Sequence, residues 1–216
     1  MPKLIPSIPH HELIKNIIFD FGGVLCDLDV RRTEKKFVEM GLRKFDPEHS
    51  KSDMGDLFRQ LEGGKLSIRQ FHNALKTFFI RPVSDNEIDE AWNDLLLEIP
   101  EVRIRLLEKI RKDYRIFLLS NSNEIHYHKY LSDFTKKFGY KNFNDLFEKA
   151  FFSFQLHLQK PDREVFEYVL KAGEMTPSET LFIDDTIQHI EGANKTGITG
   201  YHLKIKEGEQ VTDLFL

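Results

Sequence analysis

The chain has 216 residues, of which 40% are hydrophobic and 31% charged, and its formal net charge at pH 7 is −4. This length and composition indicate a globular protein with one large domain, or with one domain that carries an insertion. The acidic balance argues against a nucleic-acid partner, and the long apolar stretch that a membrane span requires is absent.

The N-terminal residues lack the basic and apolar segments of a signal peptide and indicate an irregular lead-in to the fold. The chain has one cysteine, Cys26, so an internal disulfide is excluded. We therefore expect a cytoplasmic protein in which Cys26 is a small buried side chain.

Residues 16–24 read Asn-Ile-Ile-Phe-Asp-Phe-Gly-Gly-Val. The apolar run before Asp20 is short, β-branched and aromatic, which indicates a strand buried on both faces. Asp20 then falls at the carboxyl end of this strand, the edge at which ligands bind in open α/β sheets. Gly22 and Gly23 allow a sharp turn and a close approach to a ligand. Taken alone, the segment is better explained as a strand that ends in an ordinary turn.

Residues 30–98 carry helix signals and no strand-like run. A first helix is expected over about residues 30–40, with Gly41 at its end, and Asp46-Pro47 has the N-cap and proline of another helix start. Two capping boxes mark later helices, Ser67 with Gln70 and Ser84 with Glu87. Because strands stop for about 70 residues and then resume, we interpret residues 30–98 as an inserted all-helical cap domain of about four helices. The core domain then comprises residues 1–29 and 99–216, although one continuous domain is the alternative.

Four further strands are predicted near residues 115–120, 150–153, 180–184 and 198–203, and helices separate them. Strands that alternate with helices indicate βαβ units. The expected fold class is therefore α/β, with a Rossmann-like parallel sheet flanked by helices and the helical cap inserted after the first strand.

Three of the strands deliver polar groups at their carboxyl ends, and a lysine follows a fourth. These groups are Asp20, Ser120 with Asn121, Asp184 with Asp185, and Lys160. In a parallel sheet they meet at one edge, where clustered carboxylates repel one another unless a cation joins them. Carboxylate and carbonyl oxygens suit Mg²⁺, and the remaining groups can hold a phosphoryl group that Asp20 attacks. Singly, Ser120 and Asn121 are equally good helix caps, and Lys160 is an ordinary solvated lysine.

Four motifs resemble those of the haloacid dehalogenase (HAD) superfamily in order and spacing. They are residues 19–25, 118–121, 160–161 and 182–185, the last followed by Ile-Glu-Gly-Ala at 190–193. The helical insert is similar to the helical cap of this superfamily. Residues 61–67 resemble a bacterial branch that includes glucose-1-phosphate phosphatase and other sugar-phosphate phosphatases.

The resemblance implies a metal site. Asp20 would be both the nucleophile and a Mg²⁺ ligand, and the carbonyl of Gly22 would be a second ligand. Asp185 would bind the metal directly, and Asp184 would be a ligand or a partner of one.

The resemblance also implies a phosphoryl site. Ser120 and Asn121 would hold the phosphoryl oxygens, together with the turn at Gly22 and Gly23. Lys160 would neutralise charge on the phosphoryl group and on Asp20, so Asp20, Ser120 and Lys160 are the expected catalytic residues.

Two departures from the superfamily pattern concern proton transfer. Gly22 stands where most phosphatases of the superfamily carry a second aspartate as general acid and base, so the acid for the leaving group is unidentified. Gly22 alone predicts a preference for acidic leaving groups, as in aryl phosphates, acyl phosphates and sugar 1-phosphates. His189 lies in the region where a further aspartate is common, either as an acid-base residue or, the interpretation favoured by sequence, as a histidine on a helix surface.

The leading hypothesis is a Mg²⁺-dependent phosphatase that acts on a small phosphorylated metabolite, such as a sugar phosphate. The alternatives are a phosphotransferase, a metal-free dehalogenase, and a catalytically impaired binding or regulatory protein. Arg31, Glu62 and His72 are candidate cap contacts to substrate, but surface salt bridges explain them equally well. The sequence leaves the substrate open, and also the choice between monomer and homodimer.

Overall fold

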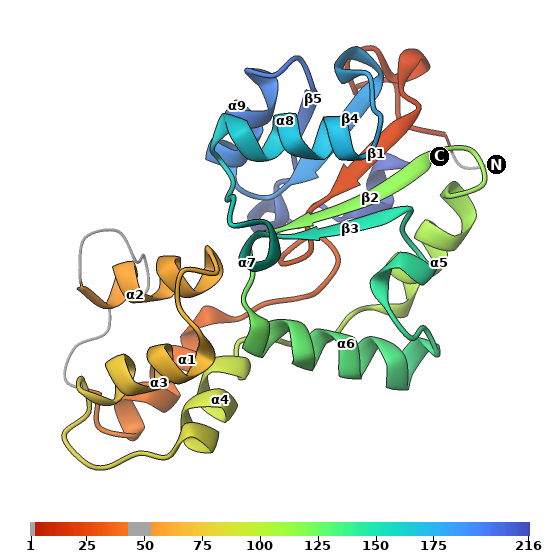
Figure 1. Cartoon of the computed structure of the whole chain (residues 1–216). Helices are drawn as coiled ribbons and strands as arrows, with labels where there is room; N and C mark the ends of the chain where they lie inside the picture. Colours follow the sequence, from red (N-terminus) through yellow and green to blue (C-terminus); the bar gives the residue numbers. More distant parts are fainter. Residues whose placement is uncertain (1–2, 43–52) are drawn as a thin grey trace.

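The computed structural model describes residues 3–42 and 53–216, and in it the strands form one parallel five-stranded sheet with the order β3-β2-β1-β4-β5 (Figure 1). The strands are β1 (Asn16–Phe19), β2 (Arg115–Ser120), β3 (Lys149–Phe152), β4 (Thr180–Asp184) and β5 (Thr199–His202). The predicted α/β fold is confirmed, and β1 is its central strand. The predicted helix start at Asp46-Pro47 lies outside the described residues.

Helices cover both faces of the sheet because the strands are apolar on both sides. Ile17 and Phe19 of β1 point to a core shared with α5 (Glu101–Ile110) and α6 (Glu124–Phe138). Ile18 points to the opposite core, which α8 (Arg163–Ala172) and α9 (Ile187–Asn194) complete. Full burial of one such side chain contributes roughly 1.5–3 kcal/mol. The apolar residues on both faces therefore stabilise the packing of helices against each side of the sheet.

The register aligns the strand ends that carry the candidate site. Phe19 pairs with Leu118 of β2 on one side and with Ile183 of β4 on the other. The residues just after these pairs, including Asp20 and Asp184, therefore emerge at one edge of the sheet.

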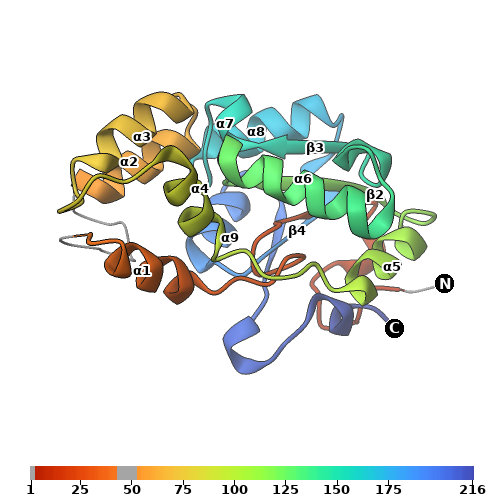
Figure 2. The same cartoon turned by 90° about the horizontal axis from the view of Figure 1, so that it is seen from below.

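The helical segment predicted after the first strand is present. It contains α1 (Val30–Glu39), α2 (Asp53–Glu62), α3 (Ile68–Lys76) and α4 (Asp85–Asn93). Both predicted capping boxes form, and Gly41 follows α1 with a φ of 93°. Trp92 stacks on Phe58 with ring centroids 4.4 Å apart, in a core that these helices share. Among the described residues, none of this segment joins the main sheet, and the four helices gather at the carboxyl ends of its strands (Figures 1 and 2).

Two chain crossings connect this helical segment to the sheet. The amide of Asp27 donates to the carbonyl of Glu98, the amide of Leu97 donates to that of Asp27, and Leu28 bridges Leu96 in the antiparallel sense. The crossings therefore run side by side. Cys26, just before them, is buried as expected, and burial raises the pKa of its thiol to about 12.

The remaining helices are short. They are α7 (Ser153–Leu156) and the 3-10 turns η1 (His11–Leu13), η2 (Phe143–Asp145), η3 (Pro177–Glu179), η4 (Ile205–Glu207) and η5 (Val211–Leu214). Lys3 and Leu216 exchange backbone hydrogen bonds, so the two ends of the described chain lie together (Figure 1). No helix among the described residues is both long enough and apolar enough to cross a membrane.

Candidate active site

Three carboxylates meet at the carboxyl edge of the sheet. Asp20 follows β1, Asp184 ends β4 and Asp185 comes next, and oxygen atoms of all three lie within 4.8 Å of one another. The parallel register brings them together, as the spacing of the apolar strands predicts. Three oxygen donors at this separation form a set that suits a hard divalent cation such as Mg²⁺.

Lys160 lies buried between two of these carboxylates. Its Nζ is 2.6 Å from Oδ1 of Asp20 and 2.6 Å from Oδ2 of Asp184, and it donates to the carbonyl of Leu119 at 3.0 Å. Burial alone would lower the pKa of Lys160, but the charges of Asp184 and Asp20 raise it above its usual value. Lys160 is therefore a fixed buried cation, not the solvated lysine that its sequence context alone would suggest.

The two carboxylates beside Lys160 respond differently to burial. Burial is the largest influence on Asp20 and raises its pKa to about 7, although Lys160 acts in the opposite direction. Burial also disfavours the charge of Asp184, but Lys160 and then His189 outweigh it and lower the pKa of that carboxyl. One lysine thus does not offset the negative charge of three adjacent carboxylates, and a divalent cation fits this charge balance.

Both carboxylate oxygens of Asp184 are engaged by protein groups, whereas Asp185 lines the cavity described below. Oδ1 of Asp184 accepts from the amide of Thr186 at 2.8 Å, and Oδ2 lies 3.0 Å from Nδ1 of His189. Asp184 is fully buried and does not line the cavity described below, which Asp20 and Asp185 do line. This geometry favours Asp185 as a direct metal ligand and Asp184 as the group that orients Lys160.

His189 points into the site. Its side chain is 18% exposed, and its Nδ1 contacts the carboxylate of Asp184. The expectation that His189 is an ordinary surface histidine is therefore wrong. The reason is its position in the first turn of α9, which begins three residues after the end of β4.

Asn121 connects two of the sequence motifs. Its side-chain amide donates to the carbonyl of Lys160 at 2.9 Å, and its Oδ1 accepts from the amide of Lys160 at 3.0 Å. The side chain of Asn121 thus holds the loop that carries Lys160. Ser120 ends β2, is buried and lines the cavity.

The glycine turn after Asp20 is required by close packing. Gly23 has a φ of +77°, and a Cβ placed on it would lie 2.6 Å from Oδ2 of Asp185. A side chain here would therefore displace a candidate metal ligand. Gly22 lines the cavity, and a Cβ on it would lie 2.7 Å from Cδ1 of Leu28.

A cavity of about 310 Å³ opens onto these groups. Its core side carries Asp20, Ser120, Lys160 and Asp185, and its other wall is formed by residues of the helical segment, the crossings and α6. These wall residues are Leu28, Val30, Thr33, Glu62, Trp92, Leu95, His126 and Tyr130. Apart from Glu62, which the sequence offers as a candidate cap contact, sequence patterns do not identify this wall, because only the tertiary fold brings its residues together.

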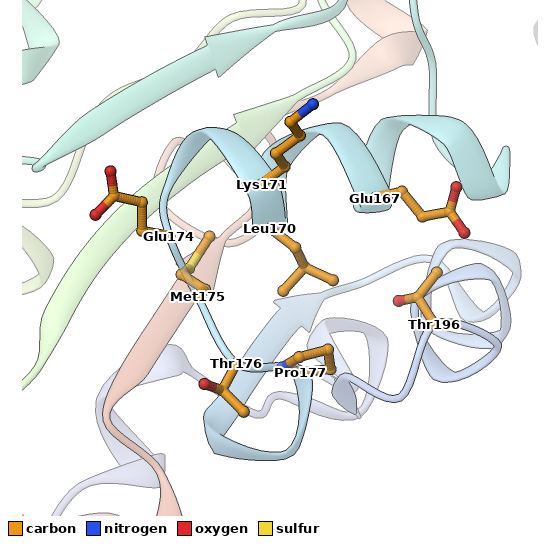
Figure 3. A pocket seen from close by; sticks show the side chains of 8 residues that line it. All are labelled: Glu167, Leu170, Lys171, Glu174, Met175, Thr176, Pro177 and Thr196. Carbon is orange, nitrogen blue, oxygen red and sulfur yellow. The ribbon is translucent and has the colours of Figure 1, made fainter.

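A larger hollow of about 550 Å³ lies elsewhere, between α8 and the segment around Thr176 and Pro177 (Figure 3). Glu167, Lys171 and Glu174 lie at its rim, and no candidate site residue lines it. Volume alone therefore does not identify the site; the convergence of charged groups does.

The three candidate cap contacts fall in different places. Arg31 is exposed and pairs with Asp29 at 3.0 Å, and Nε2 of His72 lies 2.6 Å from Asp89 within the helical segment. Contacts with nearby carboxylates thus explain Arg31 and His72. Glu62, in contrast, lines the cavity.

Comparisons with known proteins agree with this geometry. A family model for haloacid dehalogenase-like hydrolases matches residues 14–197. The D-ribitol-5-phosphate phosphatase of Bacteroides thetaiotaomicron is 34% identical over 185 residues, which cover 86% of this chain and 89% of that protein.

Solved structures show the same similarity. A crystal structure of a HAD family enzyme from Bacteroides thetaiotaomicron, in complex with magnesium and inorganic phosphate, matches with a TM-score of 0.83 and 34% identity, covering 93% of this chain and 98% of that one. A HAD-like family hydrolase of Porphyromonas gingivalis matches with a TM-score of 0.79 and 30% identity, covering 88% and 91%. With these motifs in place at one sheet edge and the family model matching most of the chain, this protein belongs to the haloacid dehalogenase-like hydrolase family.

Proposed function

We propose that this protein is a Mg²⁺-dependent phosphatase that hydrolyses a small sugar or polyol phosphate through an aspartyl-phosphate intermediate. The observation that carries the proposal is the position of Lys160 between Asp20 and Asp184, beside Asp185 and at the base of a cavity. This arrangement supplies a nucleophile, a cation for phosphoryl oxygens and a donor set for a metal.

The residues that would hold Mg²⁺ are Asp20, Asp185 and the carbonyl of Gly22, with Asp184 next to them. Oxygen donors within 4.8 Å and an excess of negative charge fit the ion. When bound, Mg²⁺ would neutralise charge on the phosphoryl oxygens and so stabilise the transition state.

The chain's own residues supply the two displacement steps. The carboxylate of Asp20 attacks phosphorus, and the bond from phosphorus to the ester oxygen breaks. The ammonium of Lys160 and the hydroxyl of Ser120 stabilise the charge on the phosphoryl oxygens during this transfer. Water then attacks the phosphorus of the aspartyl-phosphate, which releases inorganic phosphate and restores Asp20.

The helical segment, residues 30–98, would act as a cap domain over a core of residues 1–29 and 99–216. The two crossings at Asp27 and Leu97 run side by side between these two parts, which suits a hinge. Closure of such a cap would exclude water from the site around Lys160.

A small phosphorylated substrate fits the cavity. The cavity has a volume of about 310 Å³, which lies at the lower end of the usual range for ligand sites, about 300–1,000 Å³. The similarity to a D-ribitol-5-phosphate phosphatase supports a polyol or sugar phosphate as the substrate class. The finer resemblance to glucose-1-phosphate phosphatases stays a prediction.

The test is phosphate release from 4-nitrophenyl phosphate and from a panel that contains D-ribitol 5-phosphate, with Mg²⁺ and with EDTA. We expect turnover that depends on Mg²⁺ and is lost in Asp20→Asn. No release from any ester in the presence of Mg²⁺ would refute a phosphatase. Halide release from a 2-haloacid in EDTA would instead support a metal-free dehalogenase.

A further inference from the structure

The proposed phosphatase reaction lacks an assigned acid, and the inference below rests on that proposed function. In a sugar or polyol phosphate the leaving group is an alkoxide, which needs a proton as its bond to phosphorus breaks. A positioned acid typically contributes ~10²–10⁴-fold to such a step. Gly22, which lines the cavity two residues after Asp20, has no side chain to donate that proton.

Most titratable groups of the cavity are already engaged. Lys160 and Asp20 pair with each other, and Nδ1 of His189 contacts Asp184. Nε2 of His126 lies 3.2 Å from the carbonyl of Trp92, and burial lowers the pKa of this histidine to about 3. Burial also raises the pKa of Tyr130 well above its usual value. His126 and Tyr130 are therefore poor proton donors to an alkoxide at neutral pH, and Lys160 and His189 are already held by carboxylates.

Glu62 differs from all of them. It is half-buried, it lines the same cavity as Asp20, and its carboxyl group has no ion pair or hydrogen bond among the described residues. Burial is the sole cause of the shift in its pKa, which rises to about 7. A carboxyl with this pKa is partly protonated at neutral pH, as an acid that later becomes a base must be.

The backbone of Glu62 is tied to the core beside the phosphoryl site. Glu62 ends α2, and its carbonyl accepts a hydrogen bond from the hydroxyl of Ser153 at 2.6 Å. The same hydroxyl oxygen accepts from the amide of Ser122, which follows the motif residues at the end of β2. Ser153 thus connects the end of α2 directly to the strand end that carries Ser120.

Two neighbouring contacts hold the end of α2 in the same place. The side chain of Gln159, the residue before Lys160, donates to the carbonyl of Arg59 at 3.3 Å. A Cβ on Gly64 would overlap the carbonyl oxygen of Phe154 in α7, so the turn after Glu62 packs directly on the core. Helix α2 accordingly lies against α7, where the helical segment meets the core (Figure 2).

We propose that Glu62 is the general acid and base of the reaction, in place of the carboxyl that Gly22 lacks. In the first step a bond forms from Asp20 to phosphorus, the bond to the ester oxygen breaks, and the proton of Glu62 passes to that oxygen. In the second step water attacks phosphorus, the bond to Asp20 breaks, and the proton of the water returns to Glu62. Atoms and charge balance over the cycle, and water is the co-reactant.

The test compares Glu62→Gln with wild type over esters of graded leaving-group acidity, from 4-nitrophenyl phosphate through phenyl phosphate to D-ribitol 5-phosphate. The measured quantity is kcat/KM, which reports the first transfer. We expect a loss of ~10²–10⁴-fold for the alkyl ester and of less than about tenfold for the 4-nitrophenyl ester, whose leaving group needs no proton. Glu62→Ala should show the same pattern and serves if Glu62→Gln does not fold.

Glu90→Gln is the matched control, because Glu90 is an exposed glutamate of α4 in the same helical segment. It should leave kcat/KM unchanged for every ester. His189→Asn tests the competing donor, and a loss confined to alkyl esters in that variant, with none in Glu62→Gln, would overturn the proposal.

Other outcomes are also decisive. An equal loss for all esters in Glu62→Gln would make Glu62 a binding or structural residue, and no loss would give it no role; each overturns the inference while leaving the phosphatase function in place. If wild type releases phosphate from none of these esters in the presence of Mg²⁺, the proposed function itself fails.

Discussion

The ammonium group of Lys160 lies 2.6 Å from Oδ1 of Asp20, and both side chains are almost completely buried. A buried ion pair of this kind stabilises little by itself, because both charges have lost their hydration. It does hold the Asp20 carboxylate and a cation in fixed positions at the base of the cavity, so that neither has to be ordered during the reaction.

The first prediction concerns this carboxylate. Asp20→Asn removes the nucleophile and should lower phosphatase turnover by more than about 10³-fold. Because burial raises the pKa of Asp20 to about 7, the neutral amide should not reduce thermal stability at pH 8. Activity and a thermal unfolding curve on the same preparation check both points. Substantial turnover in a folded Asp20→Asn protein would exclude the aspartyl-phosphate route.

The second prediction concerns the cation. Lys160→Met would leave Asp184, which is fully buried, without its charged partner. Loss of one partner of a buried pair costs about 3–5 kcal/mol, so urea unfolding should show a decrease in the free energy of unfolding of that order. Mg²⁺ should restore part of it by offsetting the carboxylates. Lys195→Met, at an exposed lysine after α9, is the control and should change stability by less than about 0.5 kcal/mol.

The third prediction concerns metal affinity. A ligand at a concentration 100 times its Kd stabilises the native state by about 2.7 kcal/mol, so Mg²⁺ should raise the melting temperature of wild type. Asp185→Asn should reduce the rise in melting temperature caused by Mg²⁺ by more than it lowers the melting temperature measured in EDTA. The reason is that Asp185 faces the cavity and Asp184 does not. Asp113→Asn, at an exposed aspartate that does not line the cavity, should behave like wild type. Equal Mg²⁺ shifts in both variants would contradict the assignment of Asp185.

Much of the site follows from local sequence. Ile17 and Phe19 form a short apolar strand, and the polar residue after it must leave the sheet at the carboxyl edge. The same reasoning places Ser120 and Asp184, because the order of a parallel sheet brings these strand ends together. The capping boxes at Ser67 and Ser84 are likewise local, since each involves residues three apart.

The orientation of individual side chains does not follow from local sequence. The burial of Lys160 depends on two carboxylates 140 and 24 residues away, and the Asn121 side chain reaches a backbone 39 residues distant. A histidine is found both on surfaces and in buried sites, so the exposure of His189 depends on how α9 packs on the sheet. The same holds for Glu62, whose position depends on the contact between α2 and the core, which no spacing in the sequence encodes.

The fourth prediction uses the pKa of Glu62, which rises from 4.5 to about 7 because of burial. The folded protein therefore binds an extra proton between these pH values, and the contribution of Glu62 to stability falls as pH rises from about 4.5 to about 7. Glu62→Gln lacks this penalty. At pH 8 it should be more stable than wild type by at most about 3 kcal/mol, and at pH 4 the two should be equal.

The measurement is urea unfolding in EDTA over pH 4–8, with Glu90→Gln as the control that should follow wild type. Other titratable and charged groups line the cavity or pack near α2, namely Asp20, His126, Tyr130, His157, Lys160, Asp185 and His189. They are common to both proteins, so the difference between the two curves isolates Glu62. A pH-independent difference would mean that the Glu62 carboxyl is not desolvated in the folded protein.

The last prediction concerns an acid introduced at position 22 in place of Glu62. If Glu62 donates the proton, a carboxyl at position 22 should substitute for it, because Gly22 lines the same cavity two residues after Asp20. Gly22→Asp alone meets an obstacle: a Cβ at this position would lie 2.7 Å from Cδ1 of Leu28. The side chain of Leu28 lines the cavity and would have to rotate away to admit the new side chain. Gly22→Asp should therefore be introduced together with Leu28→Ala.

In a Glu62→Gln background, the pair Gly22→Asp and Leu28→Ala should restore kcat/KM for D-ribitol 5-phosphate by roughly 10-fold or more, with little change for 4-nitrophenyl phosphate. Leu28→Ala alone in that background is the control and should restore nothing, since it adds no acid. The new carboxyl lies beside the candidate metal ligands, so Mg²⁺ affinity must be measured in the same variants. A gain that appears equally for both esters would point to altered metal binding, whereas a gain confined to the alkyl ester means that proton supply to the leaving oxygen was the missing function.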